Sequence, residues 1–192
     1  RLITINAEVI AISRQPIPKE LASISNLKWI QMDISKENLN ALKFSEIEVV
    51  FHLAGATLGA GSDEVLFLES NEQTTVRLIK SLSGIAHRFI IASSQVVYGN
   101  ANNLEITEDF PIMPEGSAYA CSKVNSENWL RWFQKHNGGQ YLVMRFCGFI
   151  EGGGIIDYII DKALTGENIE LFSEGKTCRD YLPVDEAINV LV

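Results

Sequence analysis

The chain of 192 residues has few cysteines, and their spacing is not that of a disulfide-bonded or metal-binding protein. Cys121, Cys147 and Cys178 lie far apart, are odd in number and show no CxxC spacing. They therefore predict neither a disulfide framework nor a cysteine-based metal site. We expect no bound metal and a reducing compartment, the cytoplasm.

Basic residues in excess and long apolar runs are also missing. Sixteen Lys and Arg against 24 Asp and Glu give a net charge of −8, which argues against nucleic acid, because clustered basic side chains bind a phosphate backbone. The longest apolar runs, such as RFIIAS and YLVMRF, are much shorter than the roughly 20 residues that cross a bilayer, and nothing at the N-terminus resembles a signal peptide. We expect a soluble protein with no nucleic-acid or membrane partner.

Short apolar segments rich in β-branched and aromatic residues are present, and they are typical of strands. Five occur, at residues 8–13, 27–32, 48–55, 88–94 and 141–146, and their continuous apolar character predicts burial on both faces. Longer amphipathic segments at 63–84 and 117–139 close on glycine and predict helices. This alternation predicts an α/β fold with a doubly wound parallel sheet.

The composition changes near residue 151. Residues 1–150 contain the five predicted strands, whereas 151–192 contain a glycine run, one predicted helix, a short strand, a turn and the start of a further helix. The chain also begins with what resembles the end of a helix leading into a strand. Since a doubly wound sheet normally opens with a strand before that helix, we expect both ends to be truncated.

Three polar side chains are expected to meet at one edge of the sheet. Ligands bind beyond the carboxyl ends of the strands in such folds, and the strand at 88–94 ends in Ser93 and Ser94. Tyr119 and Lys123 are four residues apart and share a helical face. A nearby ammonium favours a phenolate and thereby predicts a tyrosine that acts as a general base. The alternative is a surface ion pair between Lys123 and Glu127, one turn later.

Seven segments in a fixed order resemble the extended short-chain dehydrogenase/reductase family, in particular its NAD-dependent epimerase/dehydratase group, which acts on nucleotide sugars. They are LKWIQMDIS, VVFHLAG, SNEQTT, IIASSQVVYG, PIMPEGSAYACSK, LVMRFCGFIEG and EGKTCRDYLPVDEA. The resemblance implies that Ser94 hydrogen-bonds the reacting sugar hydroxyl and that Tyr119 transfers its proton. It also implies that Lys123 holds the nicotinamide ribose and lowers the pKa of the tyrosine.

The same resemblance implies a wider set of site residues. Those for the cofactor, NAD or NADP, are Ser13, Arg14, Asp33, Ile34, Leu53, Ala54, Gly55, Asn71, Tyr119 and Lys123, and those for the substrate are Ser94, Gln95 and Arg179. Residues 1–150 then form a dinucleotide-binding Rossmann-type domain without its first strand and glycine-rich loop, and 151–192 begin a substrate-binding part. We expect the loop upstream of Arg1, since Gly55, Gly59 and Gly61 follow the wrong strand with the wrong spacing.

Three departures from the family pattern bear on function. Ser13 and Arg14 occupy the place where an acidic residue would bind the adenosine ribose, so either NAD or NADP is possible, and Arg14 could equally stack on adenine or be solvated. Gln95 and Val96 replace the acidic pair of the 4,6-dehydratases, which disfavours dehydration. Gly148 replaces an asparagine that contacts the nucleotide sugar in epimerases, which puts the substrate in doubt.

The main hypothesis is a 4-epimerase that transfers hydride at C4 of a nucleotide sugar. A 4-ketoreductase with the same residues is the alternative, and a non-catalytic dinucleotide-binding regulator is a third possibility from a different class. His52 is expected to be a packed residue, and Ser93 a structural one. Trp129, Trp132 and Phe133 predict helix packing, and the family's helical interface implies a homodimer.

Overall fold

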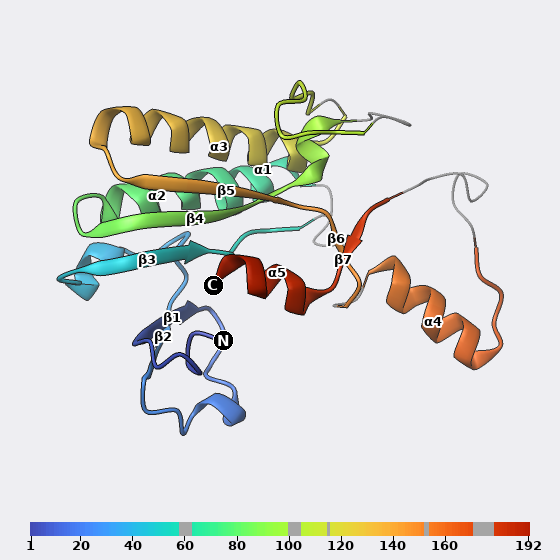
Figure 1. Ribbon diagram of the computed structural model, residues 1–192, viewed down its shortest axis with the longest axis horizontal. Helices are drawn as coiled ribbons and strands as arrows, with labels where there is room; N and C mark the ends of the chain where they lie inside the picture. The colour runs from blue at the N-terminus through green and yellow to red at the C-terminus, as the bar shows by residue number, and fades with distance from the viewer. Residues whose placement is uncertain (58–62, 100–104, 115, 152–153, 171–178) are drawn as a thin grey trace. The chain divides into compact units, whose positions relative to one another are not determined.

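The structure is a computed structural model that describes residues 1–57, 63–99, 105–114, 116–151, 154–170 and 179–192 (Figure 1). These residues form two compact units. One is Leu2–Phe146, and the other is Cys147–Val192 together with Arg1. The five predicted strands all lie in the larger unit.

Parallel strands form the centre of the larger unit. They are β1 (Val9–Ser13), β2 (Leu27–Gln31), β3 (Ile47–His52), β4 (Ala86–Ser94) and β5 (Gln140–Phe146). β1 pairs with β2 in one sheet, and β4 lies between β3 and β5 in the other, with every pairing parallel. The predicted α/β architecture is confirmed, but the described strands of this unit form two sheets because β1 and β3 do not pair with each other.

The helix predicted at 63–84 is present but is not uniformly α-helical. Its successive parts are α1 (Glu64–Phe67), the π-helix η4 (Leu68–Gln73) and α2 (Thr74–Leu82). Asp63 caps its start by accepting from Val65 N at 2.9 Å. At the start of α2, the hydroxyls of Thr74 and Thr75 donate back to the carbonyls of Glu69 and Asn71 in the π-helical turn. Such side-chain bonds compete with regular helical ones and widen the turn locally.

Helix α3 (Ala118–Asn137) carries the tyrosine and the lysine. The Ser117 hydroxyl caps it by accepting from Ala120 N at 3.3 Å, and Gly138, at φ 71°, ends it. Because the cap fixes the first turn, Tyr119 begins the helix at a defined position. The short 3-10 helices of this unit are η1 (Lys19–Leu21), η2 (Leu39–Leu42) and η5 (Gln95–Tyr98).

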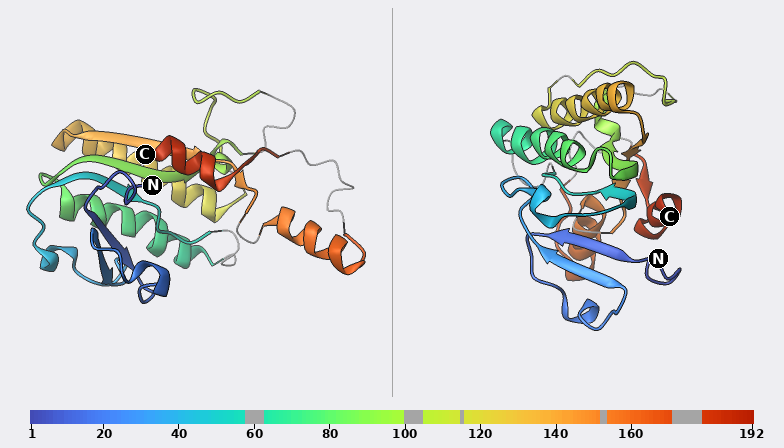
Figure 2. Two further views of the ribbon diagram at one scale, coloured as in Figure 1. Left: turned by 60° about the horizontal axis from the view of Figure 1, so that its bottom comes forward. Right: turned by 90° about the vertical axis from the view of Figure 1, so that its left-hand side faces the viewer.

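The hydrophobic core lies between the three-stranded sheet and the helices α2 and α3. Its buried members are Leu39, Leu78, Ile79, Leu82, Phe89, Ile91, Leu130 and Phe133. Helices α2 and α3 cover the same face of this sheet (Figures 1 and 2). Leu142 of β5 and Ile10 of β1 are 48% and 44% exposed, so the prediction that every strand is buried on both faces is wrong.

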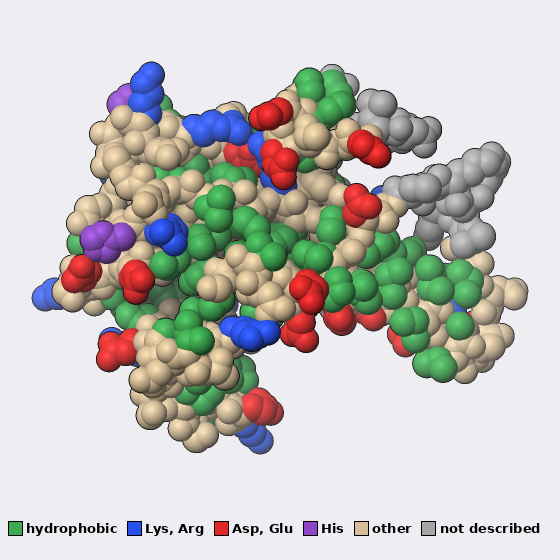
Figure 3. Space-filling model, viewed as in Figure 1, with side chains coloured by type: hydrophobic (Ala, Val, Ile, Leu, Met, Phe, Trp, Pro, Cys, Tyr) green, Lys and Arg blue, Asp and Glu red, His purple; other side chains and the backbone are tan. Residues whose placement is uncertain are grey.

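The smaller unit contains a two-stranded parallel sheet of β6 (Gly148–Phe149) and β7 (Tyr181–Leu182), with α4 (Ile155–Thr165) and α5 (Val184–Leu191). Helix α4 buries none of its residues, and hydrophobic side chains gather over it (Figure 3). Among the described residues, no helix is both long and apolar enough to cross a membrane.

Candidate functional site

Side chains from two elements meet at the carboxyl end of β4. Ser94 is the last residue of that strand, and Tyr119 and Lys123 occupy the first turns of α3. Tyr119 and Lys123 are each only 9% exposed. The Lys123 ammonium lies 5.7 Å from the centroid of the Tyr119 ring and donates to the Ala92 carbonyl at 3.0 Å. The expected trio is therefore brought together by two elements distant in sequence.

The charge states of this trio differ from the sequence-based expectation. Burial raises the pKa of Tyr119, and hydrogen bonding to Ser94 opposes this shift only in part. Burial shifts the pKa of Lys123 in the opposite direction and lowers it to about 8. In the protein without cofactor the pKa of Tyr119 is therefore raised, because burial is the largest effect on it, and the lowering by Lys123 that the resemblance implies stays a prediction for the protein with cofactor bound.

Asn71 joins the loop after β3 to helix α3. Its Oδ1 accepts from Ala56 N at 2.8 Å, and its Nδ2 donates to the Ala56 carbonyl at 3.2 Å and to Ser122 Oγ at 3.0 Å. Ser122 in turn donates to the carbonyl of Tyr119. Asn71 is 2% exposed, so its amide is a buried structural link between the loop after β3 and helix α3. The partner Ser122, one residue before Lys123, was not identified from the sequence.

Gly55 lies where backbone and side chains approach most closely. A Cβ atom at this position would be 2.5 Å from Asn71 Oδ1 and 3.6 Å from Lys123 Nζ. Any larger residue would displace the Asn71 amide, whereas its Cβ would make only an ordinary van der Waals contact with the ammonium. The glycine thus keeps the end of β3 within reach of the Tyr119 and Lys123 pair.

His52 is packed, as the sequence analysis predicts. It is 5% exposed, and its Nε2 lies 3.0 Å from Thr75 Oγ1. Burial, with a smaller contribution from the Lys123 charge, lowers its pKa to about 4. A neutral imidazole therefore fixes the last residue of β3 against α2.

A cavity of about 510 Å³ opens beyond the carboxyl ends of β1, β2 and β3. Its walls contain seven of the residues expected to bind a dinucleotide, namely Ser13, Arg14, Asp33, Ile34, Leu53, Ala54 and Gly55. Ile12 and Met32 add apolar surface from the two strand ends. The set combines a cation, hydroxyls and apolar walls, which suits the adenosine half of a dinucleotide.

Glu127 does not form the surface ion pair with Lys123 that spacing alone suggests. It is 1% exposed, and Arg145 binds its two oxygens through Nε at 3.0 Å and Nη2 at 2.7 Å. Ser93 Oγ donates to it at 2.6 Å, so Ser93 is structural, as predicted. Arg145 Nη1 also reaches the Tyr98 hydroxyl at 2.6 Å.

These contacts tie β4, β5, α3 and η5 together directly beside Ser94. Hydrogen bonding to Glu127 and Tyr98 raises the pKa of Arg145, so the guanidinium stays charged. The sequence indicates one member of this network, since the spacing places Glu127 on the same face of α3 as Tyr119 and Lys123. Its partner on β5, Arg145, could be identified only from the fold.

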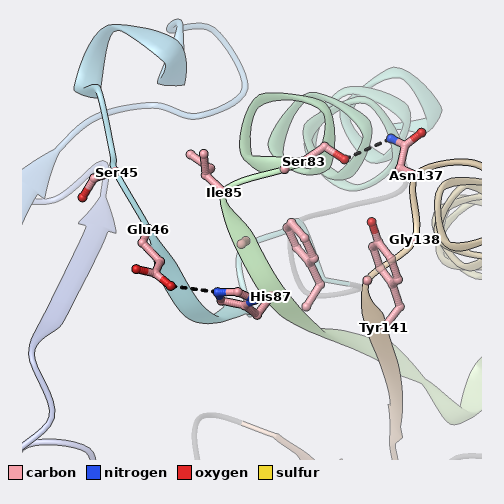
Figure 4. Close-up of a pocket in the computed structure, with 12 residues that line it drawn as sticks. Ser45, Glu46, Ser83, Ile85, His87, Asn137, Gly138 and Tyr141 are labelled. Atoms are coloured by element: carbon pink, nitrogen blue, oxygen red, sulfur yellow. Dashed lines mark hydrogen bonds and ion pairs between the residues drawn. The ribbon is translucent and has the colours of Figure 1, made fainter.

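A second cavity, of about 410 Å³, lies at the amino ends of the strands of the three-stranded sheet. Figure 4 shows the imidazole of His87 beside the carboxylate of Glu46, and Ser83 beside Asn137. None of the expected site residues lines it. It lies at the opposite strand ends from Ser94, so the chemistry of the site does not involve it.

The remaining expected residues lie outside these clusters. Gln95 is half-buried and opens η5, directly after Ser94. Arg179 is exposed and precedes β7 in the smaller unit, so its part in substrate binding stays a prediction. Gly59, Gly61 and Cys178 lie outside the described residues. Packing explains why residue 148 is a glycine, because a Cβ there would be 2.9 Å from Tyr181 Cε1.

Sequence relatives share most of this chain. A putative UDP-glucose 4-epimerase of Methanocaldococcus jannaschii is 26% identical over 97% of the chain and 65% of its own length. UDP-glucose 4-epimerase of Lactobacillus helveticus is 25% identical over 84% of the chain and 56% of its own length. The chain thus spans less than two thirds of the length of these relatives.

Solved structures agree in fold. MoeE5 in complex with UDP-glucose and NAD has a TM-score of 0.83 at 27% identity and is matched over 99% of this chain and 64% of its own. UDP-glucuronic acid 4-epimerase from Bacillus cereus, in complex with UDP-glucuronic acid and NAD, has a TM-score of 0.85 at 23% identity, over 97% and 64%. The model of the NAD dependent epimerase/dehydratase family matches residues 1–192, and the chain therefore belongs to that family.

Proposed function

We propose that the protein is a cytoplasmic, nicotinamide-dependent enzyme that transfers hydride at C4 of a nucleotide sugar, as a 4-epimerase. The observation that carries this proposal is the meeting of Ser94, Tyr119 and Lys123 at the carboxyl end of β4. A hydroxyl, a phenol and an ammonium together can orient an alcohol and handle its proton. The sequence relatives named as 4-epimerases support the same reading.

The residues present fit a dinucleotide cofactor. The cavity beyond β1, β2 and β3 would hold its adenosine half. Gly55 would let the cofactor pass close to the strand end, where a side chain would collide with Asn71. When bound, the nicotinamide supplies the acceptor and donor of hydride, and the protein supplies orientation and proton handling.

In the proposed reaction Ser94 orients the C4 hydroxyl, and Tyr119 removes its proton as the hydride leaves C4. The raised pKa of Tyr119 keeps the phenol protonated at neutral pH in the cofactor-free protein. A base is needed for oxidation, so positive charge must favour the phenolate, and Lys123 is the cation beside the ring. Return of the proton from Tyr119 completes the reverse step.

A nucleotide-sugar 4-ketoreductase is the second candidate, and Arg14 is the observation that favours it. Arg14 lines the cavity where NADPH, the usual donor for net reduction, would carry an additional phosphate. The two reactions differ in cofactor balance. Interconversion of two sugars without net change in NAD(P)H supports the epimerase, whereas stoichiometric consumption of NADPH supports the reductase.

The decisive experiment compares two tyrosine variants in the full-length protein. We expect Tyr119→Phe to lower kcat by at least about 100-fold, the usual contribution of a general base, with unchanged cofactor affinity. Tyr141→Phe is the matched control, because it removes a phenol hydroxyl from β5, beside the cavity at the amino ends of the strands. Sugar products are followed by NMR with UDP-glucose as substrate. Full activity of Tyr119→Phe would contradict the role given to Tyr119, whereas cofactor binding without any turnover of the sugar by the unaltered protein would support a non-catalytic regulator.

We also propose a homodimer formed through the helices. Val65 of α1 and Leu68 of η4 are 59% and 42% exposed, and Trp129 and Trp132 of α3 are 39% and 47% exposed. Trp129 Nε1 donates to Glu72 Oε1, so α3 and η4 form a joined surface. Phe133 is buried, as the packing prediction requires, but the two tryptophans face outward.

A further inference from the structure

The last three residues of β4 each bond to a different turn of helix α3. The Ser93 hydroxyl donates at 2.6 Å and the Lys123 ammonium at 3.0 Å. The helix residues are four positions apart and share one face, so the strand end and the helix are joined at three successive turns. The pairs are Ser94 with Tyr119, Ala92 with Lys123, and Ser93 with Glu127.

Ser93 is the last residue of β4 whose side chain lies between the sheet and the helices. Successive side chains of a strand point to opposite faces, and those of Phe89 and Ile91 on the same face belong to the core beneath the helices. Ser93 is 6% exposed. After Ser94 the chain turns into η5, so the bond from Ser93 is the final tie from this face of β4 before the serine of the site.

Glu127 does not need the Ser93 hydroxyl to compensate its charge. Its two oxygens already accept from Nε and Nη2 of Arg145, and Nη2 of Arg131 lies 3.3 Å from Oε2. The carboxylate is therefore fixed from β5 and from its own helix. Because a hydrogen bond to an ionised acceptor is stronger than one between neutral groups, the fixed carboxylate restrains the strand that carries Ser93.

We propose that Ser93 is a positioning residue, whose bond to Glu127 sets the register between β4 and α3 and so holds Ser94 beside Tyr119. The inference rests on the proposed function and deepens it, since Ser93 acts through Ser94. The other bond to the Ser94 hydroxyl, from Val96 N, is long at 3.4 Å and restrains it little. Proton transfer depends on this geometry, because a misplacement of about 1 Å can lower a rate about 100-fold.

Steady-state kinetics of the full-length protein with UDP-glucose test the inference with two serine variants. We expect Ser93→Ala to lower kcat about 10- to 100-fold, with KM and the affinity for NAD⁺ changed less than about twofold, because only the geometry of the reacting groups is altered. Ser126→Ala is the matched control. Its hydroxyl is equally buried but donates to the Ser122 carbonyl within α3, at 2.8 Å, so kcat should stay within about twofold.

The phenol of Tyr119 gives a second readout, which does not depend on turnover. Carbon-13 NMR of protein labelled at the tyrosine ζ carbon follows its ionisation, and Tyr119→Phe assigns the signal. Hydrogen bonding to Ser94 lowers the pKa of Tyr119, so Ser93→Ala should raise this pKa further and Ser126→Ala should leave it unchanged. Both variants keep the titratable groups of the surrounding elements, namely Lys123, His52, Glu127 and Arg145.

Ser93→Cys decides the question if Ser93→Ala does not fold, because a thiol fills the space but donates only weakly. Its kcat should fall about tenfold. Equal kcat values for the Ser93 and Ser126 variants would overturn the inference and leave the proposed function standing, as would an unchanged pKa of Tyr119. Absence of turnover by the unaltered protein would overturn the proposed function, and the pKa of Tyr119 in the two variants would still decide the inference.

Discussion

Lys123 combines a buried position with a side chain that is ordinarily charged. It is 9% exposed, and its ammonium donates to the carbonyl of Ala92. Among the residues that the structure describes, none of the ion pairs involves Lys123. The protein thus holds a cation in an environment that favours its neutral form, and burial lowers the pKa to about 8. Such a residue costs stability that a bound anionic or electron-rich ligand can restore.

This burial predicts a pH-dependent stability. The folded pKa of about 8 lies below the ordinary lysine pKa of 10.5, so the unfolded chain binds more protons between these pH values, and the free energy of unfolding rises with pH there. The Lys123→Met variant has no ammonium at this position, so its free energy of unfolding lacks this rise with pH. Measured by urea unfolding, the free energy of unfolding of the variant minus that of the unaltered protein should fall by about 3 kcal/mol from pH 7 to pH 10.5. A difference that stays constant with pH would contradict the burial argument.

At the scale of elements, apolar patterning identifies the strands and helices, but the contacts between elements depend on the fold. The strand ends at Ser13 and Ser94 follow from the sequence, because apolar runs give way to polar residues there. The π-helical turn does not, because it depends on Thr75 bonding to its own helix while it touches His52. The direction of the pKa shift of Tyr119 likewise depends on burial, which local sequence does not contain.

The buried Glu127–Arg145 pair predicts a large stability effect at the same scale. Replacing one partner leaves the other charge without compensation, so Glu127→Gln should lower the free energy of unfolding by about 3–5 kcal/mol. Glu72→Gln is the control, because Glu72 accepts hydrogen bonds from the neutral groups of Asn125 and Trp129 at exposed positions. Its cost should stay below about 1 kcal/mol.

A double variant separates charge from packing. Glu127→Leu with Arg145→Met removes both charges and should recover most of the loss, as measured by urea unfolding. Equal stability of Glu127→Gln and the unaltered protein would show that the pair does not bind the elements together. A stable double variant with reduced kcat would show that the network also positions Ser94.

For the molecule as a whole, the proposed dimer makes its own prediction. The exposed apolar side chains of α1, η4 and α3 include Trp132 at 47%. Trp132→Arg would place charge at the centre of the proposed interface and should convert a dimer to a monomer in light scattering coupled to size-exclusion chromatography. Leu164→Arg is the control, because Leu164 is 81% exposed on α4 of the smaller unit. A monomeric unaltered protein would contradict the proposal.

The π-helical turn from Leu68 to Gln73 has a consequence for how the chain tolerates changes in length. Bonding five residues apart, where an α-helix bonds four apart, accommodates one surplus residue in a single turn. A deletion of one residue elsewhere in α2 would rotate every later side chain by about 100°. A deletion of one residue within the π-helical turn can instead convert the turn to a regular α-helix and leave the core contacts of Leu78 and Leu82 in register. Asn71 would then lose its position, so the helix would persist while the loop after β3, which Asn71 binds, would be released.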